Sequence, residues 1–256
     1  PSSALGRIPL TTAFAQSCNT AFAGAAGTVT GEQLHAAAGS LGVGTDYDVG
    51  FTSNFGTVEP GNSIDLAASM IGQGQVTMSP LGMATVAASI GAGRTVLPWL
   101  VKGEEATPTA APLTASEAQS LQALMTATVT SGTGRSLQGL MTGAKTGTAQ
   151  WGQTGALQTS AWMIAYNDRY AVASFVEGGD SGGTTAAALD RGPPNAVNSF
   201  RSHCKTRSPA ASQGHTRFAS GSAVPPNRAS AVQTMPHAPP FRPESLSGRT
   251  PPCGEE

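Results

Sequence analysis

Residues 139–150, GLMTGAKTGTAQ, begin a run of three mainly apolar segments that continues with AWMIAY at 161–166 and YAVASFVE at 170–177. The last two segments are apolar or alternate between apolar and polar residues, and the turn Asn167-Asp168-Arg169 separates them. Short runs of this kind around a polar turn are typical of a β-hairpin. We therefore predict three consecutive strands, joined as an antiparallel meander, over these segments.

Helical patterns fill the chain before the strands. Leu10, Phe14 and Phe22 recur at helical spacing, so residues 10–26 are predicted to form one mostly buried helix. Further helices are expected over residues 32–40, 64–70, 80–91 after the N-cap Ser79, and 117–129 after the N-cap Ser116. Helices first and an antiparallel meander last predict an α+β fold with the helices packed on the sheet.

The chain divides into two parts of different character near residue 189. Of the 18 prolines, 11 lie in residues 189–256, and this part carries a formal charge of +4, against -5 for residues 1–188. It shows no period of 2 or 3.6, so it lacks the apolar faces that offset the entropy of ordering a chain. We predict a domain over residues 1–188 and a disordered tail over 189–256, whose abrupt start suggests a shifted reading frame.

The composition excludes several classes of function. The net charge is -1 and charged residues make up 11% of the chain, so the sequence has no overall field that attracts nucleic acid. The three cysteines lack the spacing of a zinc site, and the calcium-like start Asp46, Asp48, Gly50 is followed by none of the later ligands. We expect no metal and no cofactor.

Two short motifs carry candidate chemistry. Lys145-Thr146-Gly147-Thr148 lies inside a predicted strand, where a lysine is costly unless it faces a polar site and a glycine leaves room for a close approach. Ser17-Cys18-Asn19 is the only S-x-N in the chain and lies on the first predicted helix, where its two polar side chains need partners. Taken alone, this pair is also explained by local capping.

S-x-N comes before K-T-G in the chain, and in that order the two motifs resemble part of the S-x-x-K, S-D-N and K-T-G signature of serine β-lactamases and penicillin-binding proteins. The segments AFAQSCNTAFA (13–23), TSGTGRSLQG (130–139) and MTGAKTGTAQ (141–150) are similar to class B penicillin-binding proteins, especially those of actinobacteria. I-G-Q-G followed by S-P-L-x-M-A, within residues 71–84, favours this family over a β-lactamase. The resemblance covers roughly residues 6–185.

The resemblance implies a D,D-transpeptidase that cross-links peptidoglycan stems through a serine acyl-enzyme, with D-Ala-D-Ala peptides and β-lactams as ligands. It implies that Ser17 belongs to a proton relay, that Asn19 bonds the amide of the bound peptide, and that Lys145 supports the relay and attracts the ligand carboxylate. Thr146, Gly147 and Thr148 are then substrate-binding, with the Thr148 N–H in the oxyanion hole. The full-length family member would act at the outer face of the plasma membrane, with a glycosyltransferase as a possible partner.

The nucleophile motif departs from the family pattern. S-x-x-K should precede S-x-N, but the one match in this sequence is Ser202-His203-Cys204-Lys205, in the predicted tail. The strands and final helix that complete the family sheet are also expected to be missing, so an inactive carboxy-terminal fragment is predicted. Two alternatives stay open: a β-lactamase or D,D-carboxypeptidase relative, and a non-catalytic binding or scaffolding module.

Overall fold

The computed structural model of the chain describes residues 6–44, 46–61, 63–152, 156–187 and 229–236. The helices and strands lie in the order expected for α+β, which confirms that prediction. The α-helices are α1 (Leu10–Ala15), α2 (Asn19–Ala23), α3 (Gly31–Ser40), α4 (Ser63–Ser69), α5 (Pro80–Ala92) and α6 (Ala115–Ser131). Short helices are η1 (Ala26–Thr28), η2 (Arg135–Leu137) and η3 (Gly182–Ala186), and the strands are β1 (Gly143–Trp151), β2 (Gln158–Tyr166), β3 (Tyr170–Glu177) and β4 (Ala229–Pro236).

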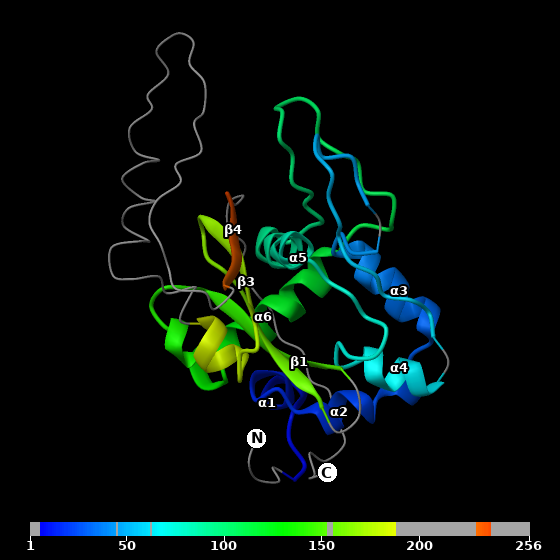
Figure 1. Cartoon of the computed structure of the whole chain (residues 1–256), viewed down its shortest axis with the longest axis vertical. Helices are drawn as coiled ribbons and strands as arrows, with labels where there is room; N and C mark the ends of the chain where they lie inside the picture. The colour runs from blue at the N-terminus through cyan, green and yellow to red at the C-terminus, as the bar shows by residue number, and fades with distance from the viewer. Residues whose placement is uncertain (1–5, 45, 62, 153–155, 188–228, 237–256) are drawn as a thin grey trace.

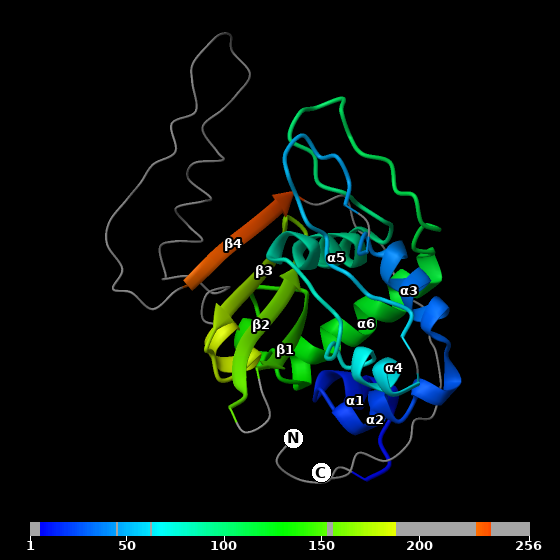
Figure 2. The ribbon, with the colours of Figure 1, turned by 45° about the vertical axis from the view of Figure 1, so that its right-hand side comes forward.

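The four strands form one antiparallel sheet in the order β1-β2-β3-β4. The meander predicted over the first three strands is confirmed, although β1 begins at Gly143 and not at 139, because 139–142 form the turn after η2. Figure 2 shows β4 at the far edge of the sheet, beside β3. β1, which contains the K-T-G motif, therefore forms the opposite edge.

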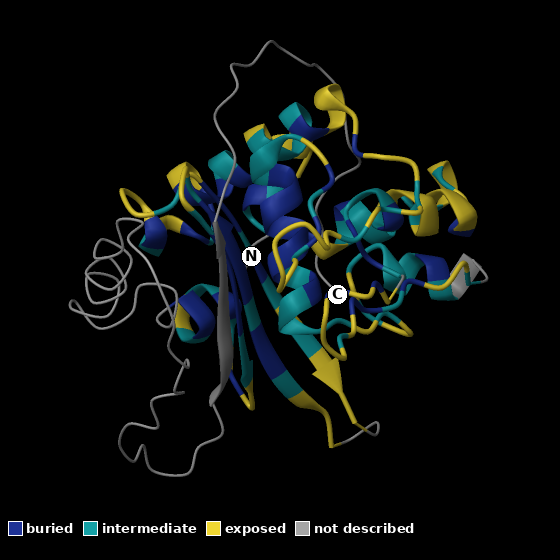
Figure 3. Ribbon diagram, turned by 90° about the horizontal axis from the view of Figure 1, so that it is seen from above, coloured by how far each residue is buried: buried dark blue, intermediate teal, exposed yellow. Residues whose placement is uncertain are grey.

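Alternating residues of β2 and β3 face two different cores. Ile164 and Tyr166 belong to an apolar cluster with α5. Met163 and Ala165 belong to a second cluster with Leu137 and with Ala186 and Ala187, which follow β3. Figure 1 shows α5 and α6 on one side of the sheet and η3 on the other. Seen from above, the middle of the sheet is buried and the outer end of one strand is exposed (Figure 3). The sheet is thus a central layer, with α5 and α6 covering one face and η3 packed on the other.

The helix caps agree with the sequence at α5 and differ at α6. Ser79 accepts a hydrogen bond from the N–H of Gly82, as its prediction as N-cap requires. At α6 the cap is Thr114 and not Ser116: its hydroxyl accepts the N–H of Glu117, whose carboxylate accepts the N–H of Thr114. This reciprocal pair is a capping box, which satisfies two backbone donors at once and moves the helix start two residues earlier.

The single helix predicted over residues 10–26 is wrong, because the chain breaks at the S-x-N motif. α1 ends at Ala15, Ser17 adopts the left-handed region with φ 55°, and α2 begins at Asn19. The N–H of Cys18 then bonds the carbonyl of Ala13 across the break. The apolar spacing continues through both helices, so periodicity alone does not reveal the break.

The predicted tail contains one described element. β4 lies within residues 189–256, where no regular structure was expected, and pairs with β3 from Tyr170↔Pro236 to Val176↔Ala229. The rest of the tail, including Ser202-His203-Cys204-Lys205, lies outside the described residues. Across the part of the chain that is described, no helix has the length and apolar character required to span a membrane.

Candidate active site

The break between α1 and α2 turns Ser17 toward the sheet. Its hydroxyl lies 2.9 Å from the ammonium nitrogen of Lys145, which is 128 positions away in the sequence. A serine in the left-handed region is uncommon because its Cβ is crowded there, and such residues gather at functional sites. The strained backbone is therefore what brings one candidate residue within hydrogen-bond distance of the other.

Lys145 reaches Ser17 from β1 through a largely apolar environment. Its Nζ donates to the Ser17 hydroxyl at 2.9 Å and to the Thr146 carbonyl at 2.7 Å, and it lies 5.5 Å from the centroid of the Phe14 ring. Burial without a carboxylate partner disfavours the charged form and lowers the pKa of Lys145 to about 8. An amine with this pKa can exchange a proton with a hydroxyl near neutral pH.

Thr146 is buried, and because it follows Lys145 on β1 its side chain lies on the opposite face of the strand. Its hydroxyl lies 2.6 Å from the hydroxyl of Thr133, in the loop after α6. Each hydroxyl can both donate and accept, so the pair can reorient toward an anion that approaches Lys145. Thr133 was not among the residues singled out from the sequence, although it lies in the quoted segment TSGTGRSLQG.

The loop that carries Thr133 also holds the end of α1. The N–H of Thr133 donates to the carbonyl of Ala15 at 3.0 Å, and the Gln16 side chain donates to the carbonyl of Ser131 at 2.9 Å. A Cβ on Gly132 would lie 2.2 Å from the Ala15 carbonyl oxygen, so only glycine permits this approach. These contacts set the position of the turn that presents Ser17.

A second glycine supports β1 from the opposite face of the sheet. A Cβ on Gly182 of η3 would lie 2.7 Å and 2.8 Å from the carbonyl oxygen and the nitrogen of Gly147, and 2.1 Å from the Trp162 carbonyl oxygen. The η3 backbone thus packs directly behind the K-T-G motif. The sequence signal for this role is the pair Gly182-Gly183, which was not singled out.

The remaining predicted site residues lie around the Ser17–Lys145 contact. Asn19 is exposed at the first position of α2, and Thr148 is exposed on β1, while Gly147 between the two threonines is half-buried. The structure therefore brings Ser17 and Lys145 into direct contact, whereas the side chain of Thr146, which follows Lys145 in the chain, bonds Thr133. It leaves the side chains of Asn19 and Thr148 open to a ligand.

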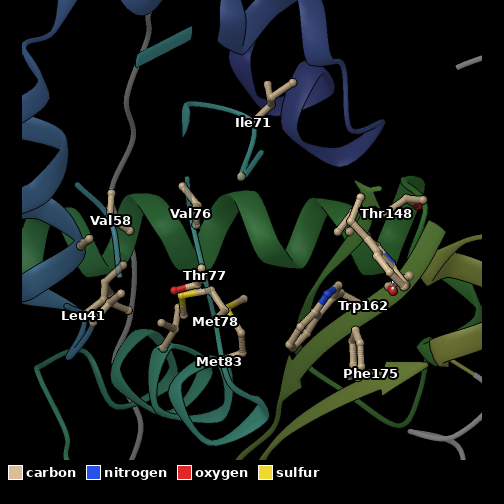
Figure 4. Close-up of a pocket in the computed structure, with 18 of the residues that line it drawn as sticks. Leu41, Val58, Ile71, Val76, Thr77, Met78, Met83, Thr148, Trp162 and Phe175 are labelled. Atoms are coloured by element: carbon tan, nitrogen blue, oxygen red, sulfur yellow. Dashed lines mark hydrogen bonds between the residues drawn. The ribbon is translucent and has the colours of Figure 1, made fainter. Parts of the chain in front are cut away.

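An apolar cavity of about 780 Å³ opens beside Gly147 and Thr148. Trp162 and Phe175, whose ring centroids lie 4.6 Å apart, form one wall (Figure 4). The opposite walls come from α3, α5 and the chain between them and include Leu41, Val58, Val76, Met78 and Met83. The lining is mostly apolar, so the cavity suits an apolar group or a further apolar segment.

No group of three or more histidine, cysteine, aspartate or glutamate side chains suited to a metal occurs among the described residues. The chemistry that Ser17 and Lys145 can support is proton transfer between a hydroxyl and an amine, next to the backbone of the edge strand β1.

Comparison with known proteins was made at the levels of sequence and structure. The family model described as the penicillin binding protein transpeptidase domain matches residues 2–191. No curated protein matches the chain significantly.

Several solved structures share the fold. PBP2 of Pseudomonas aeruginosa, in complex with WCK 5153, is 21% identical with a TM-score of 0.57, over 70% of this chain and 45% of that one. The D,D-transpeptidase domain of a peptidoglycan glycosyltransferase from Eggerthella lenta is 21% identical with a TM-score of 0.57, over 78% of this chain and 54% of that one. PBP2 of Helicobacter pylori, in complex with MreC, is 22% identical with a TM-score of 0.54, over 70% of this chain and 38% of that one. The chain thus spans about half, or less, of the length of these structures.

Proposed function

We propose that this chain, which belongs to the family of penicillin-binding protein transpeptidase domains, carries the proton-relay and peptide-binding part of a peptidoglycan D,D-transpeptidase. The reaction would cross-link cell-wall stems through a serine acyl-enzyme. The observation that carries the proposal is the 2.9 Å contact between Lys145 Nζ and Ser17 Oγ beside the exposed edge of β1. A D-Ala-D-Ala stem peptide, or a β-lactam, is the proposed ligand.

The roles follow from the chemistry of each group. Lys145, with a pKa of about 8, exchanges a proton with Ser17 and attracts the carboxylate of the ligand. Two of its three protons point to Ser17 and to the Thr146 carbonyl, which leaves the third for the carboxylate. The exposed carboxamide of Asn19 binds the peptide amide.

The carboxylate and the oxyanion are bound by different groups of the same strand. The Thr146 hydroxyl, with its partner Thr133, donates to the carboxylate beside Lys145. The Thr148 hydroxyl assists from the exposed face, and its backbone N–H provides half of the oxyanion hole. Gly147 allows the ligand backbone to approach the strand closely.

The nucleophilic serine is proposed to come from a segment outside this chain. The one S-x-x-K in the sequence is Ser202-His203-Cys204-Lys205, which follows K-T-G instead of preceding S-x-N. The apolar cavity that borders Gly147 and Thr148 supports the proposal, because it leaves room for an apolar segment beside the K-T-G motif. The full-length protein, of the class B type found in actinobacteria, would act at the outer face of the plasma membrane with a glycosyltransferase as partner.

Fluorescent penicillin on a denaturing gel tests this proposal. The present chain should stay unlabelled, because loss of a nucleophile costs on the order of a million-fold in acylation rate. A chain extended by its natural upstream segment should become labelled. In that extended chain Lys145→Ala should greatly weaken labelling, whereas the matched change at the exposed Lys102, Lys102→Ala, should leave it unchanged.

Two outcomes would contradict the proposal. Stable labelling of the present chain at any serine would show that the nucleophile lies within it, and Ser202 would be the first residue to test. An extended chain that folds and stays unlabelled would favour a non-catalytic module.

A further inference from the structure

β1 is an edge strand, and its outer backbone groups are already partly occupied by side chains. It pairs only with β2 among the described strands, so every second residue directs its N–H and C=O away from the sheet. The Lys145 ammonium bonds the Thr146 carbonyl at 2.7 Å. Farther along the same edge, the Gln73 side chain contacts Thr148 and Gln150.

The carboxamide of Gln73 bonds two outward-facing backbone groups of β1 that a neighbouring strand would otherwise bond. Its Nε2 donates to the Thr148 carbonyl at 3.3 Å, and its Oε1 accepts the N–H of Gln150 at 3.3 Å. A primary carboxamide can donate and accept at the same time, as the N–H and C=O groups that a neighbouring strand directs toward β1 would do together. Both distances lie beyond the usual range for N–H···O bonds, so a stronger partner can displace the side chain readily.

The backbone around Gln73 is held independently of this contact. Gly72 and Gly74 on either side have φ angles of 72° and 69°, a region that favours glycine. The N–H of Gln73 donates to the Ala68 carbonyl at 3.0 Å at the end of α4, and the Gln73 carbonyl accepts the N–H of Val76 at 3.4 Å. The side chain can therefore leave β1 while the turn that carries it stays in place.

We propose that Gln73 is a built-in occupant of the peptide-binding edge of β1, which an extended peptide ligand must displace before it can pair with Thr148 and Gln150. An extended peptide binds a free sheet edge through its main-chain amides, and Gln73 holds one donor and one acceptor that such a peptide needs. The ligand class rests on the proposed function: a peptide with a free terminal carboxylate next to Lys145. Gln73 thereby lowers affinity for strand-like peptides and limits how far along the edge they extend.

Amide hydrogen exchange tests the occupancy directly. In Gln73→Ala the Gln150 N–H should exchange faster than in the wild-type chain, because it loses its acceptor, while the N–H of Ala149, which points toward β2, should not change. The matched control is Gln75→Ala, an exposed glutamine two residues away on the same loop. Equal Gln150 exchange in wild type and Gln73→Ala would overturn the proposal.

Peptide binding tests the competition. The probe is diacetyl-L-lysyl-D-alanyl-D-alanine, titrated into wild type, Gln73→Ala, Gln73→Glu and Gln75→Ala and followed by NMR. Gln73→Ala should bind about two- to tenfold more tightly than wild type, the range set by one displaced hydrogen-bonded group. Gln73→Glu, which can still accept from Gln150 but cannot donate to Thr148, should lie between them, and Gln75→Ala should match wild type.

The outcomes separate this inference from the proposed function. If wild type binds the peptide and Lys145→Ala weakens binding, but Gln73→Ala binds equally or more weakly, only the Gln73 proposal fails. If neither wild type nor Gln73→Ala binds the peptide, the proposed function fails, and the competition fails with it.

Discussion

At the scale of single residues, the central finding is a lysine with a lowered pKa that is held against a serine in a strained conformation. Ser17 has a φ of 55° and lies 2.9 Å from Lys145. A left-handed serine costs on the order of 1 kcal/mol or more, and the surrounding contacts must offset that cost. The bonds from Thr133 to Ala15, from Gln16 to Ser131 and from Cys18 to Ala13 are among the contacts that hold the turn.

The pKa of Lys145 gives a pH dependence with a defined sign. Burial lowers the pKa of Lys145 from an ordinary 10.5 to about 8, so between these values the unfolded chain binds more protons than the folded chain. The free energy of unfolding should therefore rise as the pH increases through this window, because the penalty for a buried charge is relieved. Urea unfolding of wild type and Lys145→Met should show wild type gaining stability relative to the variant from pH 8 to 10.5.

A matched substitution checks that the gain arises at this lysine. Lys102→Met, at an exposed position, should retain the wild-type dependence on pH. If Lys145→Met and Lys102→Met have the same dependence, folding does not lower the pKa of Lys145.

At the scale of elements, loops and caps decide where the site residues lie. The loop after α6 bonds α1 through Thr133 and β1 through the Thr133–Thr146 hydroxyl pair. α6 itself packs on both α1 and β1. The S-x-N and K-T-G motifs are thus held together by α6 and the loop after it, which contain neither motif.

The start of α6 offers a prediction that separates two candidate caps. Thr114→Ala should destabilise the folded chain by about 1 kcal/mol, because it removes the hydroxyl that accepts the Glu117 N–H. Ser116→Ala should have a much smaller effect, since Ser116 lies inside the first turn. Thermal unfolding of the two variants measures the difference, and a larger loss for Ser116→Ala would show that the helix begins as the sequence pattern suggested.

At the scale of the whole molecule, β1 and β4 are the two edge strands of the described sheet, and the outer edge of β1 stays open. The open edge is where a peptide ligand is proposed to bind, and the apolar cavity of about 780 Å³ lies beside it. β4 comes from the part of the sequence that was predicted to be a structureless tail over 189–256. The division into a domain over 1–188 and this tail stays a prediction.

Removal of residues 188–256 tests the contribution of β4. The truncated chain should melt at a lower temperature and associate as its concentration rises, because the outer edge of β3 loses its partner and an unpaired strand edge promotes association. Calorimetry and analytical ultracentrifugation would measure the two effects. A truncated chain that stays monomeric and melts like the full chain would instead support the tail predicted from the sequence.

The α+β class, the meander over 161–177 and the cap at Ser79 could be predicted from local patterns, because side-chain periodicity and turn residues act over short stretches of chain. Two motifs also pointed to Ser17 and Lys145. Three features became visible only in the folded chain: Ser17 lies in a break and not on a helix, burial lowers the pKa of Lys145, and Thr133 and Gln73 reach the same strand. The Ser17 contact spans 128 positions and the Gln73 contact spans 75, and contacts at such separations depend on how the elements pack, which local patterns do not encode.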